Sequence, residues 1–499
     1  MIFARPVANW LAASGLRVIE GRGDPGFYAQ RLAAIAPFLA VIGVTYAALL
    51  HLVLFPRGRI GRLIVALPPW IGAMALVFVG VVFALTPRYL TGDEPHYLAM
   101  IESLWRDGDL DLSNQVAGQQ VDILSHTFRV GHTDVARSIH FPGLAVLLTI
   151  PFGVGGVKTV LVAVAMLWAA LARTLRPSAC VEDRRAESLA LWLVLVFSMP
   201  LVAFSGEIYP EVPAALLLAF AFSDIESRGK SWPLGVAVAA AGLGWLHVRF
   251  LAMALLLAVA ALVRSRVGRF LPLAAFAVSV LAQGVLFDHW YGSPLPWVVY
   301  GRMAEGALGN PALGFLGIFF DQQAGLLVTA PIYLMLGPAL LASWAHDRGR
   351  TVWRLALLGS YLGPVAASSS WHGFWSPSAR MWVPVSPILF VLLLEYLPFL
   401  TNHLMRRITA FLGCVSLAFG FLYVALPDKR CGVLDAPGSN FFLTLLSRVT
   451  HLPFSRVVPH LQKPTPLDVA SAVVELGVWL GLSVAAIRCF PAKAPRATL

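Results

Sequence analysis

Residues 33–55 read AAIAPFLAVIGVTYAALLHLVLF and contain no Asp, Glu, Lys or Arg. A helix of about 20 apolar residues is long enough to cross the roughly 30 Å hydrocarbon core of a bilayer. Comparable apolar runs recur along the chain almost to Arg488. Of the 499 residues, 58% are hydrophobic and 13% are charged, a balance that excludes a water-soluble protein of several domains. The sequence therefore predicts a polytopic membrane protein.

The apolar runs predict an all-α fold, a polytopic transmembrane helix bundle of about 11–13 spans that forms a single domain over residues 1–499. The segment 141–155 is short and broken by prolines, so we expect it to be re-entrant or interfacial. The candidate spans are 33–55, 63–86, 157–175, 188–204, 209–223, 233–247, 249–263, 270–288, 323–344, 353–368, 381–399, 407–426 and 468–488.

The charges indicate which connections lie on which side of the membrane. The chain has 37 Lys and Arg residues against 26 Asp and Glu, a formal net charge of +11. The basic residues gather in every second connection, which the positive-inside rule assigns to the cytoplasm, so they indicate topology and not nucleic-acid binding. Acids, His and Trp gather in the other connections, which we expect to face outward: 87–156, a large first outer loop bearing interfacial helices, then 205–210, 247–249, 289–322, 369–380 and the C-terminal outer loop 427–467.

Several common kinds of site have no support in the sequence. The four cysteines lie far apart without CxxC spacing, so neither a disulfide framework nor a structural zinc site is expected. There is no P-loop, no GxSxG and no HExxH motif, and we assign no metal ligand. No cofactor is certain. His126, His132 and His140 share the loop 87–156 and leave a divalent cation open.

The first candidate site follows directly on an apolar span. Asp93 and Glu94 are adjacent carboxylates, and His96 and Tyr97 come next. A partly buried carboxylate at the end of a span is suited to general acid or base catalysis. Pro95 and Glu94 would also fit the first turn of a helix, so capping is an alternative role.

A second pair of acids lies in the next outer connection. Glu207 and Glu211 flank Tyr209 and Pro210, and a helical backbone would place both carboxylates on one face. Acids at membrane depth cost roughly 2.5–3.5 kcal/mol on insertion scales, which favours a functional role. Solvated acids at a helix end remain the alternative.

Arg249 and His247 interrupt the apolar stretch 233–263, which is too long for one span and short for two. We expect a hairpin of half-length helices with Arg249 near its apex. A guanidinium group suits a phosphate because its planar donors stay charged. Snorkelling toward lipid headgroups is the alternative.

The outer loop 368–380 is rich in Ser and aromatic residues and ends in Arg380. Trp371 and His372 directly precede a glycine in it, and rings beside glycine and hydroxyl groups can stack on and hydrogen-bond a polyol. Asp321 belongs to the preceding outer connection. One face of the membrane is thus expected to carry acids, two phosphate-binding arginines and an aromatic rim.

At these residues the chain resembles the C-type integral-membrane glycosyltransferases, a superfamily that includes protein O-mannosyltransferases and lipid A aminoarabinose transferases. The acidic pair in the first outer loop is typical of the superfamily, and the other motifs resemble one bacterial branch. The acidic pair is Asp93-Glu94. The other motifs are the Gly-Glu-x-Tyr-Pro-Glu turn at 206–211, His247-Val-Arg249, Phe320-Asp321 leading to Gly325, and the stretch from Trp371 to Arg380.

The resemblance implies a polyprenyl-phosphate sugar as donor and inverting transfer to a glycan, lipid or protein acceptor at the periplasmic face of the bacterial inner membrane. It implies that Asp93 is the general base. As a hypothesis, Arg249 and Arg380 bind the leaving phosphate, and Glu94, Glu207 and Glu211 orient the sugar or the acceptor. The pocket is lined by His96, Tyr97 and His372, and the further substrate-binding residues are Tyr209, His247, Asp321 and Trp371. A transporter or flippase of lipid-linked sugar, or an O-antigen ligase or polymerase, remains the alternative.

Overall fold

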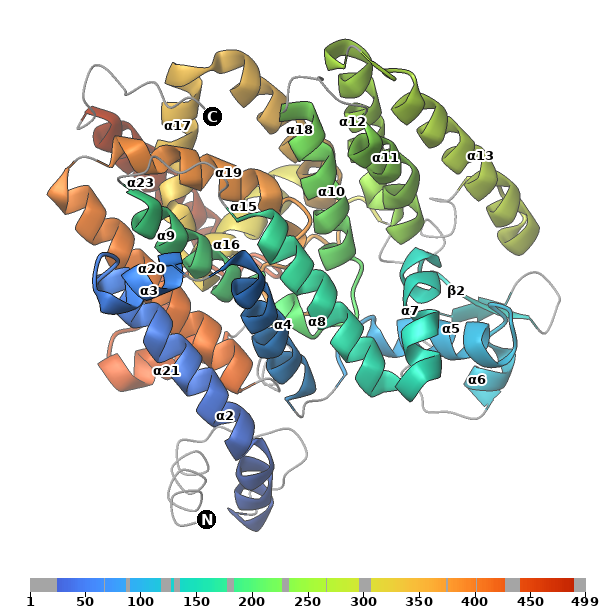
Figure 1. The fold of residues 1–499 in the computed structure, drawn as a ribbon, viewed down its shortest axis with the longest axis horizontal. Coiled ribbons are helices and arrows are strands. Elements are labelled where there is room, and N and C mark those ends of the chain that lie inside the picture. The colour runs from blue at the N-terminus through green and yellow to red at the C-terminus, as the bar shows by residue number, and fades with distance from the viewer. Residues whose placement is uncertain are drawn as a thin grey trace.

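The computed structural model describes residues 25–66, 68–86, 90–117, 127–129, 135–176, 184–226, 233–265, 267–295, 307–373, 376–400, 402–426 and 440–488. The described part of the chain is almost entirely helical (Figure 1). Five of its helices are long and apolar enough to cross a membrane: Ala36–Leu54, Val157–Thr174, Leu271–Tyr291, His403–Ala425 and Pro466–Ala486. The predicted all-α class is confirmed for these residues, and the five helices are consistent with the predicted membrane protein.

The first half of the chain supplies three segments of the candidate site. Its elements are α2 (Pro25–Leu54), α3 (Arg59–Ala66), α4 (Pro69–Leu85), α5 (Glu94–Arg106), α6 (Ser113–Ala117), β1 (Thr127–Arg129), β2 (Ala136–Ser138), α7 (Gly143–Gly155), α8 (Val157–Thr174), α9 (Arg185–Phe197), η3 (Ala203–Ser205), α10 (Glu211–Glu226), α11 (Leu234–Leu246), η4 (Val248–Phe250), α12 (Leu251–Arg264) and α13 (Leu271–Tyr291).

The second half supplies the loop that ends in Arg380 and a C-terminal segment that packs against it. Its elements are α15 (Pro311–Phe320), α16 (Leu326–Thr329), η6 (Pro331–Met335), α17 (Leu336–His346), α18 (Arg348–Ala367), η7 (Arg380–Trp382), α19 (Ser386–Tyr396), η8 (Leu397–Phe399), α20 (His403–Ala425), α21 (Phe441–Thr450), α22 (Phe454–Val457) and α23 (Pro466–Arg488).

Prolines divide two of the predicted spans. The run 63–86 is split at Pro68 into α3 and α4. The run 323–344 is split before Pro331, where Ala330 adopts an extended backbone. The ring of a proline disfavours helical geometry in the residue before it, which explains the second break. Both runs were predicted as single spans from their apolar composition alone, which does not indicate where a helix is interrupted.

The segment 87–156, predicted to be an outer loop with interfacial helices, also contains a pair of short strands. α5, α6 and α7 are gathered with a hairpin in which β1 pairs with β2 antiparallel (Figure 1). α7 occupies the segment expected to be re-entrant or interfacial, and Pro151 lies inside it. α5 packs against α7, and α7 packs in turn against α8 and α11. The segment therefore packs on α8 and on α11, the helix that ends just before His247.

The long helices present apolar side chains outward. Val278, Leu281 and Val285 on α13 are 66%, 71% and 74% exposed. Apolar surface of this extent is unfavourable in contact with water. In a chain of this composition, contact with the hydrocarbon chains of lipids accounts for it. Apolar helices of 10–17 residues, such as α11 and α15, accompany the five long ones.

Gly314 lets α15 approach α18 closely. A Cβ atom added at Gly314 would overlap the main chain of Ala366, which cannot rotate away. We expect Gly314→Ala to lower the stability of the fold by about 1–3 kcal/mol, the usual cost of overpacking. Thermal unfolding in detergent measures this loss. Gly363→Ala on α18 is the control, because a Cβ there meets open space, and equal melting temperatures for the two variants would contradict the packing argument.

Candidate functional site

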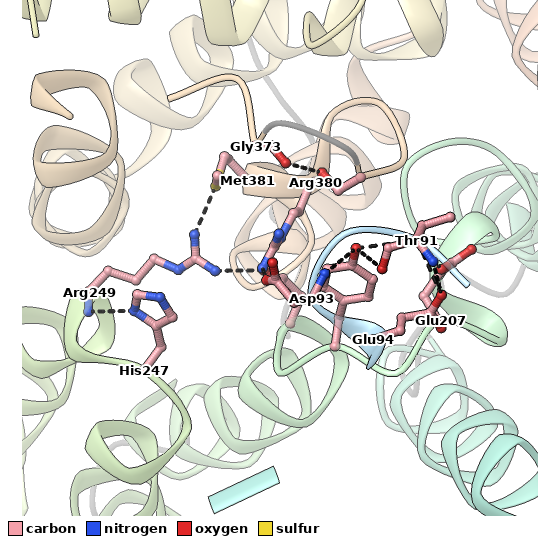
Figure 2. Close-up of polar contacts among 12 residues, drawn as sticks. Thr91, Asp93, Glu94, Glu207, His247, Arg249, Gly373, Arg380 and Met381 are labelled. Carbon is pink, nitrogen blue, oxygen red and sulfur yellow. Dashed lines mark hydrogen bonds and ion pairs between the residues drawn. The ribbon is translucent and has the colours of Figure 1, made fainter. Parts of the chain in front are cut away.

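Four segments far apart in the sequence meet at one buried polar site (Figure 2). They are the start of α5, the turn 206–211 before α10, the bend between α11 and α12, and the end of the loop 368–380. Each interrupts or borders an apolar stretch, as the sequence analysis expected. The bend is a hairpin of short helices with Arg249 in η4 at its apex, so that prediction is confirmed.

Two arginines and two acids form a continuous ionic network at the centre of the site. Glu211 Oε1 accepts from Arg380 Nε at 2.6 Å and from Arg249 NH2 at 2.7 Å. Arg380 NH2 donates to Asp93 Oδ2 at 2.6 Å. The Glu211 side chain is fully buried, and the side chains of Arg380, Arg249 and Asp93 are 6%, 13% and 17% exposed. Opposite charges are paired, as burial requires.

Arg380 is held by more than its two carboxylates. Its guanidinium group lies 4.4 Å from the centroid of the Tyr209 ring. The Tyr209 hydroxyl donates to the Thr91 carbonyl at 3.0 Å and accepts from the Asp93 main-chain N–H at 3.2 Å. Tyr209 thus fixes both the plane of Arg380 and the backbone that carries Asp93.

Glu94 and Glu207 lie on the other side of Asp93 and meet at Thr91. The Thr91 hydroxyl lies 3.0 Å from Glu207 Oε2 and 3.2 Å from Glu94 Oε2. Glu94 also accepts from the main-chain N–H groups of Thr91 and Ile208. Both carboxylates are fully buried. Glu94 therefore ties the start of α5 to the 206–211 turn, a structural role that agrees with the capping alternative.

The two acids of the 206–211 turn do not share a helix face. α10 begins only at Glu211, and residues 206–210 before it are not helical. Glu207 consequently faces Thr91, whereas Glu211 faces the arginines. A common face was expected only for a helical backbone, and this condition is not met because residues 206–210 are not helical.

Of the predicted aromatic and histidine residues, His96, Tyr97 and His247 lie in or beside this site, and His140 joins them. The His140 ring lies 5.2 Å from the ring of His96 and 5.0 Å from that of Tyr97, centroid to centroid, and all three side chains are buried. His247 stacks on Phe141, and its Nδ1 accepts from the Arg249 main-chain N–H at 3.2 Å.

Asp321, Trp371 and His372 belong to a neighbouring cluster. Asp321 Oδ1 accepts from the main-chain N–H groups of Gln323 and Ala324, and Oδ2 accepts from that of Leu461 at 2.7 Å. Burial lowers the pKa of His372 below its usual value, which the negative charge of Asp321 opposes. The Trp371 ring lies 5.4 Å from His372. The position of Asp321 favours a structural role in holding the C-terminal segment.

Sequence reasoning missed three residues of the site. Thr91 joins two acids, Met381 Sδ accepts from Arg249 NH1 at 3.2 Å, and His140 stands beside His96. Thr91 and Met381 each lie within two residues of a predicted site residue, but their residue types gave no signal. His140 was noted only as a candidate metal ligand. Within the described ranges no group of three metal-binding side chains occurs, and His126 and His132 lie outside those ranges.

Comparison of the chain with family models, with curated proteins and with solved structures finds no match. In the part of the chain that the structure describes, the fold and the site define a predominantly helical protein with five helices that could span a membrane and an ionic network of acids and arginines.

Asp321→Ala should loosen the C-terminal segment, because three main-chain N–H groups lose their acceptor. Each buried N–H left unpaired costs about 1–3 kcal/mol. We expect a lower melting temperature and faster proteolysis within residues 440–465. Asp321→Asn keeps an acceptor for two of the three groups and should lie between Ala and wild type. Wild-type protease resistance in the Ala variant would contradict the structural role.

Proposed function

We propose that the chain is an integral-membrane glycosyltransferase that moves a sugar from a polyprenyl phosphate to a glycan, lipid or protein acceptor. In this proposal the bundle has about 11–13 spans and the site faces the periplasm of a bacterial inner membrane. The observation that carries the proposal is the Asp93–Arg380–Glu211–Arg249 network, in which the Asp93 carboxylate pairs with Arg380 and the buried Glu211 joins Arg380 to Arg249.

The arginines support an anionic group in the substrate. Arg249 has five N–H donors, yet NH1 meets only the weak acceptor Met381 Sδ, and Nε is buried without a hydrogen-bond partner in the described part of the chain. A buried guanidinium group that is satisfied only in part favours an additional anion. Phosphate fits its planar donors well.

The transfer step follows from this placement. An acceptor hydroxyl attacks the anomeric carbon, its proton passes to the Asp93 carboxylate, and the bond from the anomeric carbon to the phosphate oxygen breaks. The negative charge that develops on the leaving polyprenyl phosphate is stabilised by Arg249 and Arg380. Tyr209 and Arg380 hold Asp93 in orientation. His96, Tyr97 and His247 are proposed to line the substrate site.

The opposite end of α19 supports the proposed orientation. Arg380 begins η7, the short helix before α19, and Glu395 lies near the other end of α19, where it pairs with Arg354. Arg350 and Arg354 belong to a basic connection that the positive-inside rule assigns to the cytoplasm. An outward site at the Arg380 end agrees with that assignment.

Asp93→Asn should reduce transfer by about 10²–10⁴-fold, because the amide cannot accept the proton. A deletion strain is complemented with the wild type or the variant, and mass spectrometry follows envelope glycans and polyprenyl-linked sugars. We expect the Asn variant, like the deletion, to lose one sugar and to accumulate its lipid-linked donor.

Glu102→Gln is the control for this experiment, because Glu102 lies on the same helix and pairs only at the surface with Arg106. It should restore the modification. If Asp93→Asn also restores it, the protein moves or scaffolds lipid-linked sugars and the catalytic assignment fails.

A further inference from the structure

One oxygen of Glu211 occupies the point on which both arginines converge. Figure 2 shows Arg249 and Arg380 approaching the same position from two sides. Glu211 Oε1 takes a hydrogen bond from each guanidinium group, at 2.7 Å and 2.6 Å. An oxygen held between two guanidinium groups is the arrangement that a bound phosphate oxygen would adopt.

The two arginines that pair with Glu211 differ in their number of carboxylate partners and in their exposure. Arg380 has two carboxylate partners and is 6% exposed, whereas Arg249 has Glu211 as its one ion-pair partner among the described residues and is 13% exposed. Glu211 Oε2 is buried without a hydrogen-bond partner in the same part of the chain. Arg249 is therefore the arginine that can exchange its partner at lower cost.

We propose that Glu211 is an internal competitor for the phosphate position: donor binding transfers Arg249 from the Glu211 carboxylate to the phosphate group. This inference rests on the proposed function and concerns the same site. In the empty protein Glu211 neutralises arginines that would otherwise be buried without enough partners. When the donor binds, Glu211 remains on Arg380 while Arg249 contacts the phosphate.

The competitor sets the affinity for the donor and for the product. A fixed carboxylate beside the incoming phosphate repels it and must be separated from Arg249 first. Both effects weaken ground-state binding of a phosphate-bearing lipid. Glu211→Gln keeps the shape and an acceptor oxygen but removes the charge, so the variant should bind polyprenyl phosphate about tenfold more tightly, or about 1.4 kcal/mol.

The test measures binding without transfer. Purified full-length wild type and Glu211→Gln are titrated in detergent with a short-chain polyprenyl phosphate, and intrinsic Trp fluorescence reports the dissociation constant. Inorganic phosphate, added as a competitor, should displace the probe at a lower concentration from Glu211→Gln than from wild type. In an Arg249→Gln background the gain from Glu211→Gln should disappear, because the partner to be exchanged is absent.

Glu395→Gln is the matched control, since Glu395 also pairs with a buried arginine but lies at the far end of α19. It should leave the affinity unchanged. If Glu211→Gln does not fold, as judged by size-exclusion chromatography, Glu211→Asp is used in its place. Its side chain is one methylene shorter, which moves the bridging oxygen away from the arginines, so the affinity for polyprenyl phosphate should rise by a smaller factor.

The outcomes separate the two proposals. If the wild type binds polyprenyl phosphate and both Glu211 variants bind it with equal or lower affinity, the competitor role is overturned. The glycosyltransferase proposal is unaffected by that result. No binding of polyprenyl phosphate by the folded wild type overturns both.

Discussion

The bridge from the Glu211 carboxylate to two guanidinium groups constrains much of the structure around it. A buried ion costs several kcal/mol unless a partner of opposite charge lies within contact distance. Arg249 lies at the bend between two short helices, and Arg380 lies at the end of a polar loop. Both segments must therefore reach one point beside the start of α10. The short lengths of α11 and α12 satisfy this requirement, because they place their connection at the level of Glu211.

The same constraint applies at the other end of α19. Arg354 is 1% exposed and forms ion pairs with Glu395 and Glu226. Between this cluster and the candidate site, α19 is lined by buried apolar residues. Charged groups thus fix the bundle at two levels, and apolar packing fills the distance between them. The candidate site brings four charged groups into contact, and each of its two arginines has at least one ion-pair partner.

The sequence predicted most of the members of the site but not their pairing. Four charged residues could be found because each interrupts or borders an apolar run, where a charge is costly unless it has a function or a partner: Asp93, Glu211, Arg249 and Arg380. Which acid contacts which arginine depends on helix packing that no local pattern reports. Asp321 carried the same signal as these four, yet its carboxylate accepts from main-chain groups that include the N–H of Leu461.

The span prediction was limited in a similar way. Apolarity located the long helices, including α13 and α20, because length and composition suffice for them. It could not locate the breaks at Pro68 and Pro331, nor α5 and α15, which are shorter than a span. Their positions depend on proline geometry and on tertiary contacts.

The separation of Asp93 and Arg380 by 287 residues affects how the protein is made. A ribosome delivers the acids of α5 and α10 to the membrane long before it delivers their second arginine. During that interval Glu211 has one partner at most, Arg249, which follows 38 residues later. Until then we expect the unpaired charged side chains of the early helices to remain in contact with water or with an insertion factor. Only the arrival of the segment before α19 allows the amino-terminal half to close, so the order of synthesis makes the carboxy-terminal half the final step of assembly.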